Sequence, residues 1–162
     1  MPAHAFRSEV RAGDADAVEN LVRTTGVFST AEIAIARELV EAALAEGPEA
    51  SGYHFLFADG PDGVRGYTCF GPISGTAGRY ELYWIAVDPS ERRSGLGKLL
   101  MQASEEAVRA RGGAYLFAET STRADYAAAR KFYEAAGYRA MGEIADWYAD
   151  GDGLAIYGKR LT

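Results

Sequence analysis

The stretch 87–98 has the composition of an anion-binding loop. It reads Val-Asp-Pro-Ser-Glu-Arg-Arg-Ser-Gly-Leu-Gly-Lys and joins a strand pattern to a helix pattern. The first N–H groups of a helix lack intrahelical acceptors and carry the positive end of its dipole. Gly95 and Gly97 have no Cβ, so an anion can approach the backbone closely. Three side chains of the same loop add positive charge: Arg92, Arg93 and Lys98. Together these features suit a pyrophosphate.

Two other kinds of phosphate loop fit this stretch poorly. A Walker A loop needs a glycine six positions before its lysine and Ser or Thr directly after it, but Arg92 and Leu99 stand there. A dinucleotide fingerprint needs a third glycine, where this chain has Leu100. Glu119 follows at about the spacing of a ribose-binding acid, yet only one strand–helix–strand unit is present. Taken alone, the loop leaves a helix start with solvated arginines as the alternative.

The elements before this loop are predicted from periodicity and capping residues. Alternation over 6–10 predicts a first strand, and Asp14 is placed to cap a following helix. Ser29 and Glu32 have capping-box spacing at the start of a second helix, which ends at Gly47-Pro48. The apolar stripes of these two helices are Val18, Leu21 and Val22, and then Ile33, Ala36, Val40, Ala43 and Leu44.

The middle of the chain predicts a hairpin followed by a parallel crossover. Strand patterns at 53–58 and 64–70 flank the turn sequence 59–63, which favours antiparallel pairing. A longer strand follows at 80–87, then a helix closed by Gly112-Gly113, then a strand at 114–119. The stripe of that helix is Leu96, Leu99, Leu100, Ala103 and Ala107.

The end of the chain completes an α/β (α+β) pattern. A last helical stripe stops at Gly137, and strand patterns follow at 138–144 and 154–160. The stripe consists of Ala129, Phe132, Tyr133 and Ala136. The order βααβββαβαββ predicts a mixed, mostly antiparallel sheet of about seven strands with helices on both faces. We expect residues 1–162 to form one domain, without repeats or linkers.

Composition excludes several classes of protein. Hydrophobic residues make up 48% and charged residues 25%, as in globular domains. No apolar run approaches the roughly 18 residues of a membrane span, and the N-terminus lacks a signal-peptide core. These features predict a cytoplasmic protein without membrane partners. The single cysteine, Cys69, lies in an apolar strand pattern, and the two histidines, His4 and His54, have no nearby ligand for zinc. No metal is expected.

The net charge of −6 bears on the partner. Nucleic-acid binding usually needs a basic face, so this charge argues against that class. It weakly favours a cationic partner.

Two motifs give the chain a family resemblance. Arg92-x-x-Gly95-x-Gly97 resembles the (Arg/Gln)-x-x-Gly-x-(Gly/Ala) signature of GNAT N-acetyltransferases, and Ile85-Ala-Val-Asp-Pro89 resembles the strand end before it. The run 129–138, Ala-Arg-Lys-Phe-Tyr-Glu-Ala-Ala-Gly-Tyr, is similar to that family's A-x-x-F-Y-E-x-x-G-(F/Y) helix. The resemblance implies a GNAT fold and direct transfer of the acetyl group of acetyl-CoA, as co-substrate, to a primary amine.

The resemblance also implies which residues hold coenzyme A. The backbone of Ile85, Ala86 and Val87 would pair with the pantetheine arm where two parallel strands separate. The pyrophosphate would lie on the amides of the loop, which are those of Arg93, Ser94, Gly95, Leu96, Gly97 and Lys98, beside Arg92. Many members carry Asn seven residues before their tyrosine, where this chain has Tyr126. We therefore expect Arg130 or the backbone to replace that contact.

Three side chains are the catalytic candidates that the resemblance implies. Tyr133 matches the tyrosine that protonates the departing thiolate, which a phenol can do. Glu81 and Glu119 match positions of the base in different branches of the family. Strand alternation places both among aromatic neighbours, which predicts raised pKa values. Which of the two is the base stays open, and packing alone is the alternative for Tyr133.

The acceptor and the assembly are not defined by sequence. The stretch 146–152, Asp-Trp-Tyr-Ala-Asp-Gly-Asp, would suit a cationic amine, or it is a polar hairpin with Trp147 in the core. A small-molecule amine, a peptide amine and a protein amine all remain candidates, and a homodimer is common in the family. The competing functions are an acyl-CoA sensor without turnover and a toxin-like enzyme that acetylates aminoacyl-tRNA.

Overall fold

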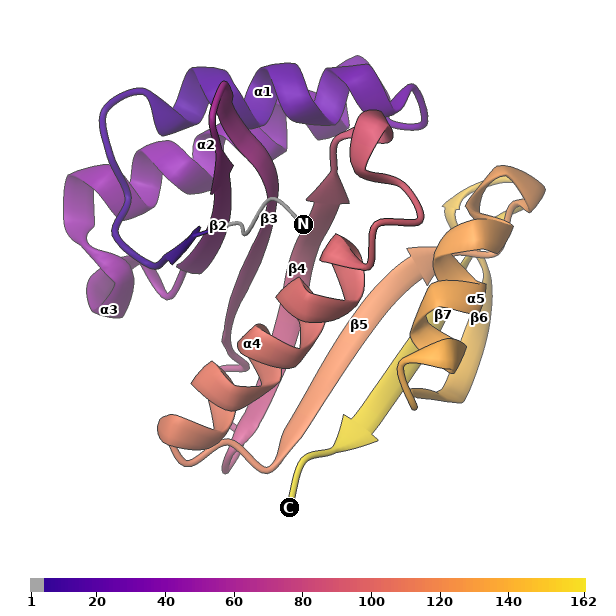
Figure 1. Ribbon diagram of the computed structural model, residues 1–162. Coiled ribbons are helices and arrows are strands. Elements are labelled where there is room, and N and C mark those ends of the chain that lie inside the picture. Colours follow the sequence, from indigo (N-terminus) through magenta and orange to yellow (C-terminus); the bar gives the residue numbers. More distant parts are fainter. Residues whose placement is uncertain (1–4) are drawn as a thin grey trace. The chain divides into compact units, whose positions relative to one another are not determined.

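The computed structural model describes residues 5–162 as a mixed α/β chain with twelve main elements and two short 3₁₀ turns (Figure 1). In chain order the elements are β1 (Ala5–Arg7), α1 (Asp14–Thr25), α2 (Thr30–Glu46), α3 (Pro48–Ser51), β2 (His54–Gly60), β3 (Gly63–Pro72), β4 (Arg79–Val87), α4 (Leu96–Ala110), β5 (Tyr115–Ser121), α5 (Ala127–Ala135), β6 (Arg139–Ala149) and β7 (Asp152–Arg160). No helix of the described part is long and apolar enough to cross a membrane.

The seven strands form one sheet in the order β1-β2-β3-β4-β5-β7-β6. Among the recorded pairings, β4 and β5 are parallel, while β1–β2, β2–β3, β5–β7 and β6–β7 are antiparallel. This mixed, mostly antiparallel sheet confirms the predicted fold class.

Contacts divide the chain into two compact units. The first consists of the chain up to Gly71 together with Trp84–Ser104, and the second consists of Pro72–Tyr83 together with Glu105–Thr162. Three elements, β3, β4 and α4, begin in one unit and end in the other. The prediction of a single domain stays a prediction.

In the first unit, α4 packs directly on β2 and β3. Leu96 and Leu100 form a buried cluster with Ala58. A Cβ at Gly66 would lie 2.9 Å from Cδ1 of Leu100, so only glycine allows this approach. The hydroxyls of Thr68 and Ser104 lie 2.7 Å apart within this interface. The close packing fixes the first turn of α4, where the phosphate loop ends.

An ion-pair cluster joins β1, α1 and β2 in the same unit. The Arg7 guanidinium donates to Asp14 at 2.7 Å and to Asp59 at 2.8 Å. The Asp14 carboxylate also accepts the Arg11 amide at 2.6 Å. Asp14 was predicted to be the N-cap of α1, and this is wrong: the N-cap is Gly13, which makes no side-chain cap bond. Its carboxylate is used for the nearly buried pair with Arg7 instead.

Several local predictions are confirmed, and some are corrected. Ser29 and Glu32 form the predicted capping box, and Cys69 is buried in β3. The predicted stripes are wrong at Leu44 and Leu99, which are 48% and 49% exposed, because they lie at the edge of their helical faces. One helical turn, α3, was not predicted, since it begins at the proline expected to end α2.

The bounds of several strands differ from the prediction. β1 ends at Arg7 rather than residue 10. β2 and β3 extend into the predicted turn, leaving Pro61 and Asp62 as the turn residues. β6 continues to Ala149, so residues 146–149 belong to a strand that was expected to end near residue 144.

In the second unit, a tight turn connects α4 to β5. Gly112 has a φ of 82°, and the amides of Gly112 and Gly113 donate to the carbonyls of Arg109 and Val108. This is the C-cap pattern predicted for the glycine pair. The turn brings Gly113 against the Tyr80 ring on β4, which places β5 beside that strand.

We predict that Gly113→Ala destabilises the protein by about 1–3 kcal/mol, the usual cost of overpacking. The new Cβ would lie 2.3 Å from Cγ1 of Val108 and 2.9 Å from Cδ1 of Tyr80. Urea unfolding would measure the loss. Gly142→Ala is the matched control, because its Cβ meets nothing within 4 Å, and it should be nearly neutral. Equal stability of the two variants would contradict this account of the turn.

Candidate active site

The phosphate-loop candidate lies in the first unit, and its beginning is held by Arg65. The Arg65 carbonyl accepts the Asp88 amide at 2.8 Å, and its guanidinium contacts Ser90 and Glu91. The Asp88 carboxylate accepts the Ser90 amide at 2.9 Å, which caps the 3₁₀ turn Pro89–Glu91. This fixed start positions the residues that follow.

The second half of the loop turns its backbone in the left-handed region. Arg93 and Gly95 have φ values of 67° and 85°. The Ser94 hydroxyl donates to the Glu91 carbonyl at 2.6 Å and accepts the Leu96 amide at 3.2 Å. Gly97 and the residue after it then lie in the first turn of α4, where N–H groups have no intrahelical acceptor. The loop therefore ends in free backbone donors.

The basic side chains of this loop are exposed and available to an anion. Arg92, Arg93 and Lys98 are all exposed, and none of them forms an ion pair with another residue in the range 5–162. Arg65, by contrast, is paired with Asp88 and Glu91. The Leu96 side chain is 1% exposed in the core, so any contribution of Leu96 to an anion site comes from its backbone.

The predicted pantetheine-binding stretch is the end of β4. Ala86 is buried, while Ile85 and Val87 are half-buried. Val87 packs on the cluster of Ala58, Leu96 and Leu100, so its side chain belongs to the core of the first unit. As with Leu96, a role of these three residues in binding would rest on backbone groups.

The two carboxylate candidates meet in the second unit. The parallel ladder of β4 and β5 runs from Arg79–Tyr115 to Leu82–Ala118 and pairs Glu81 with Phe117. Glu119 follows two residues later, so it lies diagonally next to Glu81 on the same face. The charge of Glu119 acts on the Glu81 carboxyl, so the two groups are electrostatically coupled. The structure thus brings together two residues that are 38 positions apart in the sequence.

Burial, the charge of Glu119 and the hydrogen bond with Glu119 together raise the pKa of Glu81 from 4.5 to about 7. This agrees with the raised pKa predicted for Glu81. Glu119 itself is exposed, although strand alternation predicted aromatic side chains around it. Phe117 stacks on Tyr115 at 5.2 Å instead, further along the strand.

Tyr133 lies on the other face of the same sheet. Its ring is 5.8 Å from that of Tyr157, which pairs with Ala118 and therefore points away from the side of Glu119. Burial raises the pKa of the Tyr133 phenol above its usual range. Its hydroxyl makes no hydrogen bond to any residue of the described chain, although its ring packs tightly. The phenol therefore keeps its proton and has no hydrogen-bond partner within the described chain.

The two remaining candidates have structural contacts. The Arg130 guanidinium donates to the carbonyls of Ser121 and Arg123, at 2.6 and 2.8 Å, and so holds the connection between β5 and α5. Tyr126 ends the 3₁₀ turn Ala124–Tyr126 and directly precedes α5. Arg130 is therefore largely engaged by the protein's own backbone.

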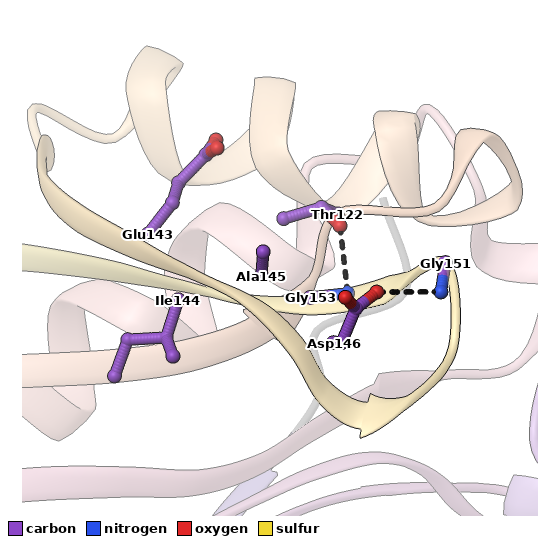
Figure 2. A pocket seen from close by; sticks show the side chains of 7 residues that line it. All are labelled: Thr122, Glu143, Ile144, Ala145, Asp146, Gly151 and Gly153. Carbon is purple, nitrogen blue, oxygen red and sulfur yellow. Dashed lines mark hydrogen bonds between the residues drawn. The ribbon is translucent and has the colours of Figure 1, made fainter.

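A separate open pocket of about 370 Å³ lies at the β6–β7 hairpin (Figure 2). Its lining consists of Thr122, Glu143, Ile144, Ala145, Asp146, Gly151 and Gly153. Asp146 has a φ of 55° and accepts the Gly151 amide at 2.8 Å. Glu143 pairs with Ala155, one register position from the Gly142–Ile156 pair that shares the face of Glu119. The pocket carboxylate of Glu143 therefore lies on the opposite face from the Glu81–Glu119 pair.

Trp147 corrects one alternative from the sequence. It is 57% exposed, so it is not a core residue of the hairpin. Trp147 and Tyr148 are both exposed on β6. The pocket at the hairpin is nevertheless lined by acids and small residues and not by either aromatic side chain.

Sequence reasoning missed a polar cluster at the C-terminal end of α5, the helix that carries Tyr133. Glu105, Tyr138 and Lys159 come from three different elements and contact one another. Glu105 falls on the polar side of an apparent helix stripe, and no motif links it to a lysine 54 positions away. The only available signal was Tyr138, the last residue of the second motif.

The comparisons decide which family this site belongs to. The sequence model of the acetyltransferase (GNAT) family matches residues 36–138, more than half of the chain. The chain is a member of the GNAT acetyltransferase family. As a member, it is an acetyl-CoA-dependent acetyltransferase. The residues that match include the phosphate loop, both carboxylates and Tyr133.

Solved structures agree with this membership. A protein assigned to the GNAT family from Desulfovibrio desulfuricans is 44% identical, with a TM-score of 0.96 over 99% of this chain and 100% of that one. An aminoglycoside 6′-N-acetyltransferase complexed with coenzyme A has the same fold at 19% identity, with a TM-score of 0.76 over 98% and 97%. The ribosomal-protein-S18-alanine N-acetyltransferase of Escherichia coli is 20% identical, with a TM-score of 0.76 over 98% and 94%. None of the curated proteins matches the sequence.

The raised pKa of Glu81 predicts a pH-dependent stability. A carboxyl that is protonated more readily when folded stabilises the fold fully below its unfolded pKa, near 4.5, and loses this contribution as the pH rises through about 7. Relative to Glu81→Gln, the wild-type protein should therefore become less stable between pH 5 and 8, by about 1 kcal/mol because the site is partly solvated. Denaturant unfolding of both proteins across this range would measure the difference, and a constant difference would contradict the pairing.

Proposed function

We propose that this acetyltransferase acetylates a primary amine that reaches the enzyme as a cation, either a small molecule or a peptide amine. The observation that carries the proposal is the Glu81–Glu119 pair, which the β4–β5 register places diagonally on one face and in which burial and the charge of Glu119 raise the pKa of Glu81 to about 7. A protonated amine has no free electron pair, so it must lose a proton before it can attack a thioester. A carboxylate with a pKa near the working pH suits that task.

The two carboxyl groups act as one unit in this proposal. Because the charge of Glu119 contributes to the raised pKa of Glu81, the proton taken up is proposed to be held by the pair. Exposed Glu119 meets the ammonium group of the acceptor, and half-buried Glu81 shares the proton that is taken up. The remaining negative charge of the pair also attracts the cationic acceptor.

The loop 92–98 is proposed to hold the pyrophosphate of acetyl-CoA, which supplies the acetyl group as a thioester. Support comes from the left-handed φ of Gly95, the open space beside it and the unpaired cations of the loop. The donors therefore match a diphosphate in both charge and type.

Tyr133 is proposed as the general acid for the departing thiolate. Because burial raises its pKa, the phenol keeps its proton throughout the neutral range. A thiolate accumulating in a buried place is a strong enough base to accept that proton. The Tyr133 hydroxyl has no hydrogen-bond acceptor within residues 5–162, so no residue of this range competes for the proton that it would donate.

The acceptor class is supported by charge. The chain has a net charge of −6, and Glu119, the proposed contact of the ammonium group, is exposed beside half-buried Glu81. Two structures of this fold are named for an aminoglycoside and for a ribosomal-protein alanine, both of which present amines. A useful test panel is therefore spermidine, kanamycin and a short peptide with N-terminal alanine.

Gly95→Asp should weaken acetyl-CoA binding by about 100-fold or more, because it places a carboxylate where the diphosphate is expected. Gly75→Asp is a matched control in the β3–β4 loop: its φ is 77° and, as at Gly95, its Cβ meets nothing within 4 Å. Isothermal titration calorimetry would compare the two variants with wild type. Equal affinity of Gly95→Asp and Gly75→Asp would place the pyrophosphate elsewhere.

Tyr133→Phe should lower kcat by about 10²–10⁴-fold, the usual contribution of a general acid, with little change in the Kd of acetyl-CoA. Thiol release with the amine panel would measure it. Tyr67→Phe is the control, because it removes the hydroxyl of another core tyrosine, one that is buried and has no hydrogen-bond partner in the described chain. Binding of acetyl-CoA without thiol release for any amine, wild type included, would favour the sensor instead.

Glu81→Gln and Glu119→Gln should each lower kcat/KM by about 10²-fold at neutral pH. Raising the pH toward the pKa of the amine should restore much of this loss, because free amine then needs no base. The same rise should not restore Tyr133→Phe. If neither glutamine variant changes kcat/KM by more than about threefold, the carboxyl pair does not carry the proton transfer.

A further inference from the structure

The buried carboxylate of Glu105 is the centre of a polar cluster in the second unit. Glu105 lies on α4 and is 4% exposed. It accepts both contacts of the Lys159 ammonium, at 3.0 and 3.2 Å, and the hydroxyl of Tyr138 at 2.8 Å. Each of its two oxygens therefore has at least one donor. The cluster joins α4, β7 and the residue before β6.

Lys159 extends the cluster to the end of α5. Its third hydrogen bond goes to the carbonyl of Ala136 at 3.0 Å, which is the C-cap residue of α5. A carbonyl at a helix C-terminus has no intrahelical donor and carries negative partial charge, so an ammonium group is a favourable partner. The helix that carries Tyr133 is thus fastened at its C-terminal end.

Tyr138 connects the same cluster directly to Tyr133. Its amide donates to the Tyr133 carbonyl at 2.9 Å, and the Gly137 amide donates to that of Glu134, the pattern of a Schellman cap. Gly137 has the left-handed φ, 91°, that such a cap requires. The rings of Tyr138 and Tyr133 lie 6.0 Å apart. One residue therefore holds the backbone of Tyr133 and touches its side chain.

A buried ion pair is a weak source of stability, because desolvating two charges offsets most of their attraction. It does fix geometry, since the donors and acceptors are satisfied in one arrangement only. Within residues 5–162, no hydrogen bond fixes the Tyr133 hydroxyl. Its position depends on its packing and on the cap that follows it.

We infer that Glu105, Lys159 and Tyr138 form a positioning cluster for Tyr133: they hold the C-terminal end of α5 so that the Tyr133 hydroxyl is aimed at the group it protonates. This inference rests on the proposed role of Tyr133 as general acid. The three residues act through Tyr133 and do not touch substrate.

The test is a double-mutant cycle with thiol release from acetyl-CoA and the best amine among spermidine, kanamycin and the alanine peptide. Tyr138→Phe and Glu105→Gln are each made in wild-type and Tyr133→Phe proteins. In the wild-type background each should lower kcat by about 10- to 100-fold, the cost of misplacing a reacting group, and leave the Kd of acetyl-CoA within about twofold. In the Tyr133→Phe background neither should cause a further loss beyond about twofold.

Two control variants separate positioning from general damage. Gly113→Ala destabilises the same unit through the α4–β5 turn, so any loss of kcat that it causes should be equal in the wild-type and Tyr133→Phe backgrounds. Glu41→Gln makes the same chemical change as Glu105→Gln at an exposed pair with Arg37 and should leave kcat unchanged. If Lys159→Met folds poorly because Glu105 is left unpaired, the double variant Glu105→Leu/Lys159→Met replaces the pair by apolar groups and should fold, with the same low kcat.

Each outcome decides the inference. Equal losses in both backgrounds would mean that the cluster acts on the whole fold, and would overturn it. Full activity of Tyr138→Phe and Glu105→Gln would also overturn it, while a large effect of Tyr133→Phe in the same assay would leave the proposed function standing. If Tyr133→Phe is itself fully active, both the general-acid role of Tyr133 and the positioning role of the cluster are wrong. This result differs from the two outcomes above, in which Tyr133→Phe loses activity.

Discussion

The register of one short parallel ladder determines the chemistry of the second unit. Arg79–Leu82 pairs with Tyr115–Ala118, and this alignment places Glu81 diagonally beside Glu119 on one face. Side chains alternate between the faces of a sheet, so a slip of one residue would send one carboxylate to the other side. The contribution of Glu119 to the raised pKa of Glu81 would then be lost.

Burial gives the two faces of this sheet opposite proton chemistry. On one face, desolvation and a neighbouring carboxyl bring the pKa of Glu81 to about 7, so the pair can exchange a proton near neutrality. On the other face, desolvation keeps the phenol of Tyr133 protonated. A single physical cause, removal of water from a charged form, therefore raises the pKa of both groups: it brings Glu81 into the neutral range and keeps the Tyr133 phenol protonated.

Much of the fold follows from local sequence, because the interactions that specify it are short-range. The Ser29–Glu32 capping box joins residues three positions apart, and the glycines at 112 and 137 take the backbone conformations that end α4 and α5. The loop 92–98, proposed to bind the pyrophosphate, belongs to this class too, since its turn depends on Gly95 and on the start of a helix. Such features were predictable, and the motifs that contain them sufficed to indicate the family.

What the tertiary structure alone decided involves contacts between distant residues. The neighbours of Asp14 predicted a helix cap, but its carboxylate accepts hydrogen bonds from the Arg7 guanidinium and the Arg11 amide. Strand alternation placed Glu119 on one face with two aromatic residues, yet its side chain is exposed, because burial depends on what covers a strand and not on the strand's own pattern. The Glu105–Lys159 pair spans 54 positions and leaves no periodic trace. Periodicity and capping residues record what each segment does by itself, whereas partners across the fold are selected only when the chain is packed.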